Sequence, residues 1–452
     1  MSKQRKVSSK AASSSAPTAP ARRRAFTLVE LLVSLVAGLL VAMAVMGLSR
    51  VATTTFHEEA RASGTELGLR VAAERLRADL SRAAYMSTTN IQKDPFVSKL
   101  KGETVVDKGN KFPNGLAILA GIAFTSGGSA AAAATGELAT EKANYSKVAS
   151  LSANNGVAPD SILLGGNMTT ADEYIVQSVI DSGGEGCGGQ TVTLSRDSAA
   201  VLRLVQKVDG SPKSDAEATS ALDDAFVPAT GGQFMARIVD DSGHQQFVAL
   251  CPAKPPAVTG TGTTIQVMIS PDSRVLSATE TGGNGGITGF AVGRITINPV
   301  QLVRWSLRRI PNALLDTGVA ATDDAKFDLV RTWVDAKGNE VKSELIAEYA
   351  TDLVFSFAYN DGTPTPRFSD FGAALPIAGP LAVPANTTAK PEQLRSVRFR
   401  LSLRTPMGDR AQPLAGPDGG FLYRYRVSDA GENAFARVRT IVSEVNLQNQ
   451  FR

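Results

Sequence analysis

The sequence has 452 residues, of which 43% are hydrophobic, and its formal net charge is +4. That length is about three domains' worth of chain, and the apolar content permits a sizeable core. Residues 1–25 carry seven lysines and arginines and no acid, so +4 less this +7 leaves −3 for residues 26–452. A mildly acidic remainder argues against a nucleic-acid-binding protein, which needs a basic surface.

An apolar run dominates the N-terminal region. Residues 1–21 are rich in Ser, Ala, Pro and Lys, and Arg22, Arg23 and Arg24 follow them. From Phe26 to Ser49 there are 24 residues with one charge, Glu30. About 20 apolar residues in a helix span a bilayer, and basic residues before such a span stay in the cytoplasm. The sequence therefore predicts one transmembrane helix, with everything after it outside the cytoplasm.

Two alternatives for this run differ in what they explain. An ordinary secretory signal peptide has a shorter apolar core and a small-residue cleavage site after it, so it fits poorly. A plain signal anchor remains open, but it gives no reason for Glu30. A carboxylate inside an apolar span costs a few kcal/mol, which makes this residue a functional candidate.

The stretch Ala25-Phe26-Thr27-Leu28-Val29-Glu30 resembles the class III signal of type IV prepilins and type II secretion pseudopilins. The resemblance implies that a prepilin peptidase cuts between Ala25 and Phe26 and then N-methylates Phe26. It also implies that residues 1–25 are a cleaved leader and that Glu30 is the family's fifth-position glutamate. Most members have Gly where this chain has Ala25, so we expect slower processing rather than none.

Glu30 has a physical role in that setting. Cleavage leaves a positive α-amine on Phe26, and the Glu30 carboxylate of an adjacent subunit can pair with it. Either charge alone is costly in a medium of low dielectric constant, and pairing offsets much of both penalties.

The helix is expected to continue beyond the membrane. Two apolar stripes recur at helical spacing: Phe56, Ala60, Ser63, Leu67 and Val71, and Leu69, Ala73, Leu76 and Leu80. Charged residues, Asp79 among them, are expected at polar positions between the stripes. The sequence therefore predicts a helix of roughly 55–60 residues. Residues 26–49 would form its membrane or filament-core half, and residues 50–86 an amphipathic half packed on a globular region, 87–452.

The globular region is predicted to consist mainly of β-strands. Apolar and polar residues alternate over 303–308 and 397–404, and the segments 327–334, 353–359, 421–427 and 436–445 are further strand candidates. Two strand-like segments flank Asp240-Asp241-Ser242-Gly243, which indicates a hairpin. No helix–strand alternation suggests a parallel sheet, so the predicted fold class is α+β, with the long helix packed on antiparallel sheet.

The chain has two cysteines, Cys187 and Cys251, both in the part placed outside the cytoplasm. Two cysteines in an oxidising compartment favour one disulfide, with two free thiols as the alternative.

A second and weaker resemblance is to the PilW-like minor pilins. It rests on the order of several stretches, among them Pro159-Asp160-Ser161-Ile162, Cys187-Gly188-Gly189-Gln190 and the ending 442–449. The resemblance implies a subunit that moves from the inner membrane to a pilus fibre at the cell surface. Its implied partners are other minor pilins, the major pilin and a PilY-type tip adhesin. A J-type minor pseudopilin and a signal-anchored periplasmic enzyme or binding protein are the alternatives.

No motif for catalysis stands out. Neither His57 nor His244 has a second histidine at zinc-site spacing, and no Gly-Lys dipeptide of a P-loop occurs. Residues 184–189 match GxGxxG, but a strand-like segment follows them instead of a helix. We therefore expect no enzymatic activity, no cofactor and no metal.

Overall fold

The computed structural model describes residues 27–91, 93–98, 101, 116, 119–125, 159–181, 187, 189–196, 198–252, 256–260, 262, 264–271, 273–283, 285–286, 294–308, 326–359, 367–368, 391–409, 425–427 and 435–450. The chain divides into two compact units, Met1–Glu59 and Ala60–Arg452. The division falls within the first helix, so the helix is the covalent link between the units.

Helix α1, Leu28–Ser81, has 54 residues, close to the predicted length. Its part in the first unit has no buried residue, whereas seven residues in the second unit are buried. The last carbonyl of the helix, Ser81 O, accepts a hydrogen bond from the Asn449 side chain at 3.0 Å. The chain then turns through Ala84, which has a φ of 59°.

The larger sheet has eleven strands among the described residues, and the named strands pair antiparallel throughout. One path runs β1-β2-β9-β3-β4-β8-β7, and the pairs β10–β11 and β5–β6 branch from β9. The strands are β1 (Ile122–Thr125), β2 (Ser161–Gly166), β3 (Tyr174–Asp181), β4 (Gln190–Leu194), β5 (Met235–Val239), β6 (Gln245–Ala249), β7 (Ala257–Thr259), β8 (Thr264–Met268), β9 (Thr296–Arg308), β10 (Asp328–Val334) and β11 (Glu340–Ala347).

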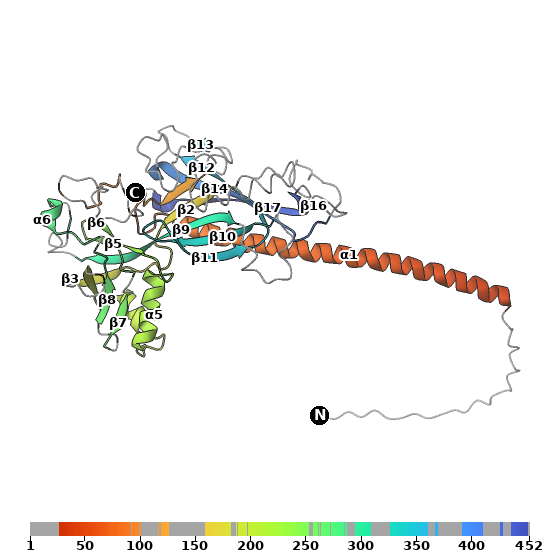
Figure 1. Ribbon diagram of the computed structural model, residues 1–452, viewed down its shortest axis with the longest axis horizontal. Coiled ribbons are helices and arrows are strands. Elements are labelled where there is room, and N and C mark those ends of the chain that lie inside the picture. Colours follow the sequence, from red (N-terminus) through yellow and green to blue (C-terminus); the bar gives the residue numbers. More distant parts are fainter. Residues whose placement is uncertain are drawn as a thin grey trace, which may run out of the picture. The chain divides into compact units, whose positions relative to one another are not determined.

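Strand β9 is the centre of this sheet and separates two apolar clusters. Val303, Trp305 and Leu307 face the main core, to which helix α1 contributes, and Val300 and Leu302 face a second, smaller core. Alternate residues of a strand point to opposite faces, so β9 contributes apolar side chains to both clusters. Figure 1 shows β9 beside β10 and β11 in this unit.

A four-stranded sheet in the order β13-β12-β14-β17 completes the main core. Phe355 and Phe357 from this sheet contact Phe124 of β1 with ring centroids 6.2 and 4.9 Å apart. A two-stranded sheet pairs β15 with β16. These strands are β12 (Ala350–Tyr359), β13 (Arg367–Phe368), β14 (Leu394–Arg404), β15 (Tyr425–Arg426), β16 (Phe435–Ala436) and β17 (Val438–Asn446).

Short helices interrupt the region that the sequence predicts as strands and loops. They are α4 (Ala199–Val205), α5 (Asp215–Phe226), α6 (Ala278–Thr281), and the 3-10 turns η3 (Pro391–Gln393) and η4 (Gln448–Gln450). Helix α5 begins with a capping box, in which Ser214 and Glu217 bond each other's backbone N–H groups. The spacing of these two residues is the sequence signal that identifies such a helix start.

The α+β class is confirmed, with the helix packed against antiparallel sheets. The hairpin at residues 240–243 is confirmed as β5–β6, and five of the six strand segments fall on named strands. The sixth, 421–427, is described only from residue 425.

Candidate assembly site on the N-terminal helix

The predicted cleavage site lies outside the described part of the chain. Ala25, Phe26 and the basic leader residues Arg22, Arg23 and Arg24 precede Thr27, where the description begins.

Glu30 closes the first turn of α1. Thr27 donates from its backbone N–H and from its hydroxyl to Glu30 Oε2, both at 3.0 Å. The Glu30 N–H donates in return to Thr27 Oγ1 at 3.3 Å. This is a capping box, which satisfies N–H groups that a helix start otherwise leaves unpaired. The sequence carries its signature, a threonine followed three residues later by glutamate, but the prediction assigned Glu30 only a partner in another subunit.

The apolar run occupies the part of α1 within the first unit. All large hydrophobic side chains from Leu28 to Val51 are exposed. Leu28–Ser49 spans about 33 Å at 1.5 Å per residue, and the hydrocarbon core of a bilayer is about 30 Å thick. By length and composition this helix can cross a membrane once.

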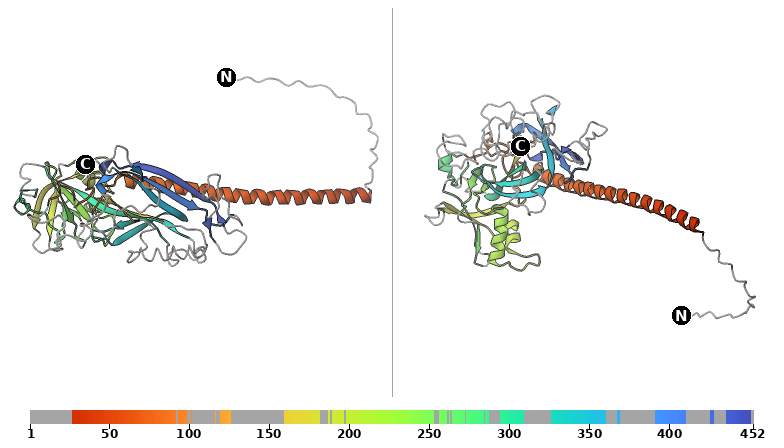
Figure 2. Two further views of the ribbon diagram at one scale, coloured as in Figure 1. Left: turned by 90° about the horizontal axis from the view of Figure 1, so that it is seen from above. Right: turned by 45° about the vertical axis from the view of Figure 1, so that its right-hand side comes forward.

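Within the second unit, one face of α1 is buried. Leu69, Ala72, Ala73, Leu76 and Leu80 each have at most 3% of their surface exposed and belong to the main core. The two alanines allow the helix backbone to approach the sheets closely. Figure 2 shows this stretch of the helix lying along the strands.

A buried charge pair fixes this face of the helix to the larger sheet. Asp79 Oδ2 accepts hydrogen bonds from Arg331 Nε at 2.7 Å and from Trp305 Nε1 at 3.0 Å. The Asp79 side chain is 7% exposed and that of Arg331 is 1% exposed. Asp79 was predicted at a polar position between the apolar stripes, and this prediction is wrong. The residue lies three positions after Leu76 and next to Leu80, on the buried face.

Glu344 of β11 extends the same network. It accepts a hydrogen bond from Trp333 Nε1 at 3.0 Å, pairs with Arg331 Nη1 at 3.4 Å, and lies 3.8 Å from Arg75 of the helix. The Arg331 guanidinium also stacks over the Trp333 ring, with its carbon 4.1 Å from the ring centroid. The buried guanidinium is thus neutralised on two sides, which is the condition for burying a charge at tolerable cost.

A second polar contact holds the helix where it enters this unit. Arg61 Nη2 lies 3.0 Å from Asp409 Oδ1, and the carboxylate also accepts a hydrogen bond from the Thr405 hydroxyl at 2.7 Å. The side chain of Asp409 is 2% exposed. Arg61 and Asp79 are 18 positions apart, so the two contacts fix both ends of the packed stretch.

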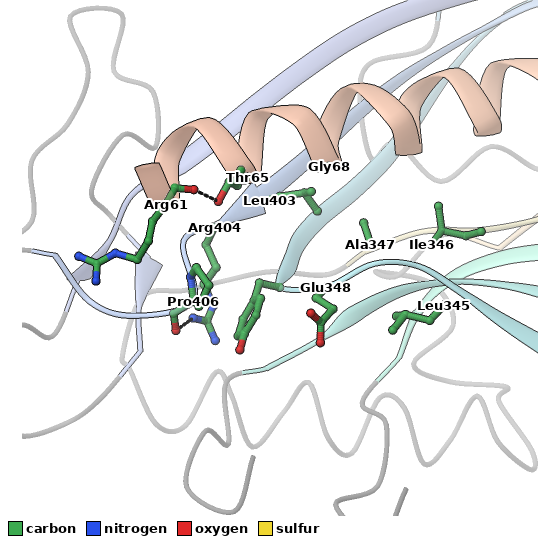
Figure 3. A pocket seen from close by; sticks show the side chains of 12 residues that line it. Arg61, Thr65, Gly68, Leu345, Ile346, Ala347, Glu348, Leu403, Arg404 and Pro406 are labelled. Atoms are coloured by element: carbon green, nitrogen blue, oxygen red, sulfur yellow. Dashed lines mark hydrogen bonds between the residues drawn. The ribbon is translucent and has the colours of Figure 1, made fainter. Parts of the chain in front are cut away.

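A cavity of about 540 Å³ lies beside the helix between these contacts. Its walls are α1, the end of β11 with the turn after it, and the end of β14 (Figure 3). The lining residues are Arg61, Gly64, Thr65, Gly68, Leu345, Ile346, Ala347, Glu348, Tyr349, Leu403, Arg404 and Pro406.

Glu348, one of these lining residues, also forms an ion pair with Lys326 at 2.7 Å. Burial would lower the pKa of this lysine, but its hydrogen bond to Glu348 and the charge of Asp328 raise the pKa above its ordinary value.

The structure joins Cys187 and Cys251 in a disulfide, with the Cα atoms 6.0 Å apart. Cys187 lies before β4, and Cys251 is two residues after the end of β6. The bond fits a region outside the cytoplasm, because disulfides persist in oxidising compartments.

Reduction of this disulfide should lower the free energy of unfolding by about 4 kcal/mol, because the bridge closes a loop of 64 residues in the unfolded chain. Chemical denaturation of the full chain in detergent, with and without reductant, measures the change. A Cys187→Ser/Cys251→Ser variant is the control, since it should not respond to reductant. Equal stability of the oxidised and reduced wild type would contradict the prediction.

The two histidines have ordinary surroundings. His57 is exposed and has an edge contact with the Phe56 ring, with centroids 6.0 Å apart. His244 Nδ1 lies 3.1 Å from Asp240 Oδ2 within the β5–β6 hairpin. Among the described residues, no three His, Cys, Asp or Glu side chains are grouped so that they could hold a metal ion. The GxGxxG match contains Cys187, which is bonded to Cys251.

No protein-family model, curated protein or solved structure matches this chain.

Proposed function

We propose that this chain is a PilW-like minor pilin. In this proposal a prepilin peptidase cuts the inner-membrane precursor between Ala25 and Phe26 and N-methylates Phe26. The subunit then enters a type IV pilus, or primes its assembly, together with other minor pilins and the major pilin. The supporting observation is one uninterrupted helix, Leu28–Ser81, with an apolar, wholly exposed first part and a second part buried along one face.

This architecture goes beyond what an anchor requires. About 20 residues suffice to hold a protein in a membrane, and a flexible linker can follow them. Here the helix runs without a break from the apolar run to Ser81, and near its end Asp79 belongs to a buried polar network. A filament subunit needs one helix that serves both the membrane or filament core and the globular part. A signal-anchored periplasmic enzyme or binding protein does not.

N-terminal mass spectrometry of protein from sheared filaments tests the proposal. We expect the mature chain to begin with N-methyl-Phe26. Ala25→Gly should be processed at least as fast as wild type, whereas Ala25→Val should accumulate as precursor, because a peptidase that accepts Gly or Ala has little room for a branched side chain.

Comparison of Ala25→Gly with Ala25→Val distinguishes a pilin from a signal-anchored enzyme or binding protein. A signal-anchored protein would keep its N-terminus and would be indifferent to the side chain at residue 25. An intact Met1 terminus in the filament fraction, or normal maturation of Ala25→Val, would overturn the proposal.

A further inference from the structure

The last turn of helix α5 carries a half-buried carboxylate, Asp223. Its Oδ1 atom is buried and accepts no hydrogen bond from any residue that the structure describes. Buried carboxylate oxygens in folded proteins ordinarily accept hydrogen bonds, because an unpaired charge is costly away from water. This position is therefore poorly suited to a carboxylate in its ionised form.

Three features of the position oppose the charge. Burial removes water from Oδ1, Asp224 places a like charge beside it, and the carbonyl oxygens at the C-terminal end of a helix repel anions. Burial first, and then the charge of Asp224, raise the pKa of the Asp223 carboxyl from its ordinary value of 3.8 to about 6. Asp223 therefore binds a proton in weakly acidic solution, where an exposed aspartate stays ionised.

The described elements packed against α5 supply no cation that offsets the charge of Asp223. Helix α5 packs against α4, β7 and β9, with β7 beside it in Figure 1. Strand β7 has no charged residue. The cations on the other two elements already pair with carboxylates: Arg203 of α4 with Asp172, and Arg304 and Arg308 of β9 with Glu340. The other charged residues of α5 itself are all acidic, namely Asp215, Glu217 and Asp224.

The turn that carries Asp223 is also the turn that joins α5 to the larger sheet. The carbonyl oxygen of Ala225 accepts hydrogen bonds from Gln301 Nε2 at 2.9 Å and from Thr169 Oγ1 at 2.7 Å. Gln301 belongs to β9 and is 0% exposed, and Phe226 at the end of the helix lies in the main core. Docking of this turn buries Asp223, so a charge on Asp223 opposes the docking.

We propose that Asp223 is a proton-binding switch for the last turn of α5. With the carboxyl protonated the turn docks firmly on β9, and with the carboxyl ionised the turn opens more often. The inference does not depend on the proposed pilin function, because it rests on α5 and its neighbours alone.

The direction of the pH effect follows from the protons bound in the two states. Because the pKa of Asp223 is raised in the docked state, docking takes up a proton between about pH 6 and pH 3.8, and the docked state gains stability as the pH falls through this window. Above the window Asp223 is ionised in both states and the docked turn bears the full penalty. Between pH 7 and pH 5 such a shift changes the opening equilibrium by about tenfold, and we expect at least about threefold because the side chain is only half-buried.

Hydrogen exchange of the backbone amides of residues 225–227 tests the proposal, measured by mass spectrometry on the full chain in detergent micelles. Wild type and Asp223→Asn are compared at the same pH, so that the pH dependence of the chemical exchange step cancels. Asparagine has the shape of the protonated carboxyl and no charge. At pH 7 we expect exchange to be at least about threefold slower in Asp223→Asn than in wild type, and at pH 5 the two rates should agree within about twofold.

Glu217→Gln is the matched control, because it neutralises a carboxylate at the other end of the same helix. The Ser214 N–H and hydroxyl donate to Glu217 Oε2 at 2.9 and 3.0 Å, and these hydrogen bonds lower the pKa of Glu217. Its charge therefore stabilises the start of α5, and Glu217→Gln should make exchange in α5 faster at pH 7.

Each remaining outcome contradicts the switch. Equal slowing by Asp223→Asn at pH 5 and pH 7 would mean that asparagine acts by something other than its lack of charge. Unchanged or faster exchange of this variant at pH 7 would mean that the carboxylate does not oppose docking. Slowing by Glu217→Gln as large as that by Asp223→Asn would assign the effect to the net charge of the helix, and each of these results would refute the proposal.

Discussion

Asp79→Asn should lower the free energy of unfolding of the globular part by about 3 kcal/mol. The substitution keeps the shape of the side chain and removes its charge, so the buried guanidinium of Arg331 loses its closest counter-charge, now 2.7 Å away. Removing one partner of a buried ion pair costs about 3–5 kcal/mol. We expect the lower end, because Glu344 still lies 3.4 Å from the guanidinium. Denaturation of the full chain in detergent, followed by tryptophan fluorescence, measures the change.

Two controls show whether the loss arises from the pair. Glu74→Gln, which breaks an exposed pair on the same helix, should change stability by no more than about 0.5 kcal/mol. Asp79→Leu combined with Arg331→Met should regain most of the loss, since apolar replacements remove both charges together. About 1 kcal/mol should remain for the buried Trp305 N–H, which would lack its acceptor. If Asp79→Asn and Glu74→Gln unfold alike, the pair does not hold the helix to the sheet.

If the chain is the pilin proposed above, Glu30→Ala should leave the protein in the membrane and remove it from filaments. The substitution deletes the one charge in the apolar run, so membrane insertion is unharmed or slightly improved. Processing at residue 25 should persist, because the peptidase reads mainly the bond and its flanks. Assembly should fail, since the α-amine of an adjacent Phe26 would be buried without a counter-charge. Immunoblots of membrane and sheared-filament fractions measure the two outcomes.

The contact between Thr27 and Glu30 requires a further pair of variants, because Glu30→Ala removes a helix cap as well as a charge. Glu30→Gln keeps an oxygen that can accept from Thr27 but carries no charge. Thr27→Ala keeps the carboxylate and removes the hydroxyl of the cap. If charge pairing drives assembly, Glu30→Gln should be lost from filaments and Thr27→Ala should enter them. The opposite pattern would show that Glu30 acts by starting the helix.

Elements whose structure depends on neighbouring residues could be predicted from the sequence. The long helix follows from an apolar run and two stripes at helical spacing, and the hairpin at 240–243 follows from turn residues between two strand-like segments. The alternation at 303–308 and 397–404 predicted β9 and β14. The residues that form each of these patterns are close together in the sequence, so the pattern can be recognised without knowledge of the fold. Helix α5 has an equally local signal, Ser214 with Glu217, although no helix was predicted there.

The sequence by itself determined that this chain has one long helix with an apolar first part, an amphipathic second part and an antiparallel α+β region after it. Only the tertiary structure decided which of the two apolar stripes is covered, because both have helical spacing and similar residues. It also decided that Asp79 is buried, since the Trp305 and Arg331 groups that compensate its charge lie 226 and 252 positions away. In the sequence a carboxylate resembles a solvated residue until the fold supplies its partners. Packing against strands that are distant in the sequence therefore decided which residues of the helix are buried, a question that local periodicity left open.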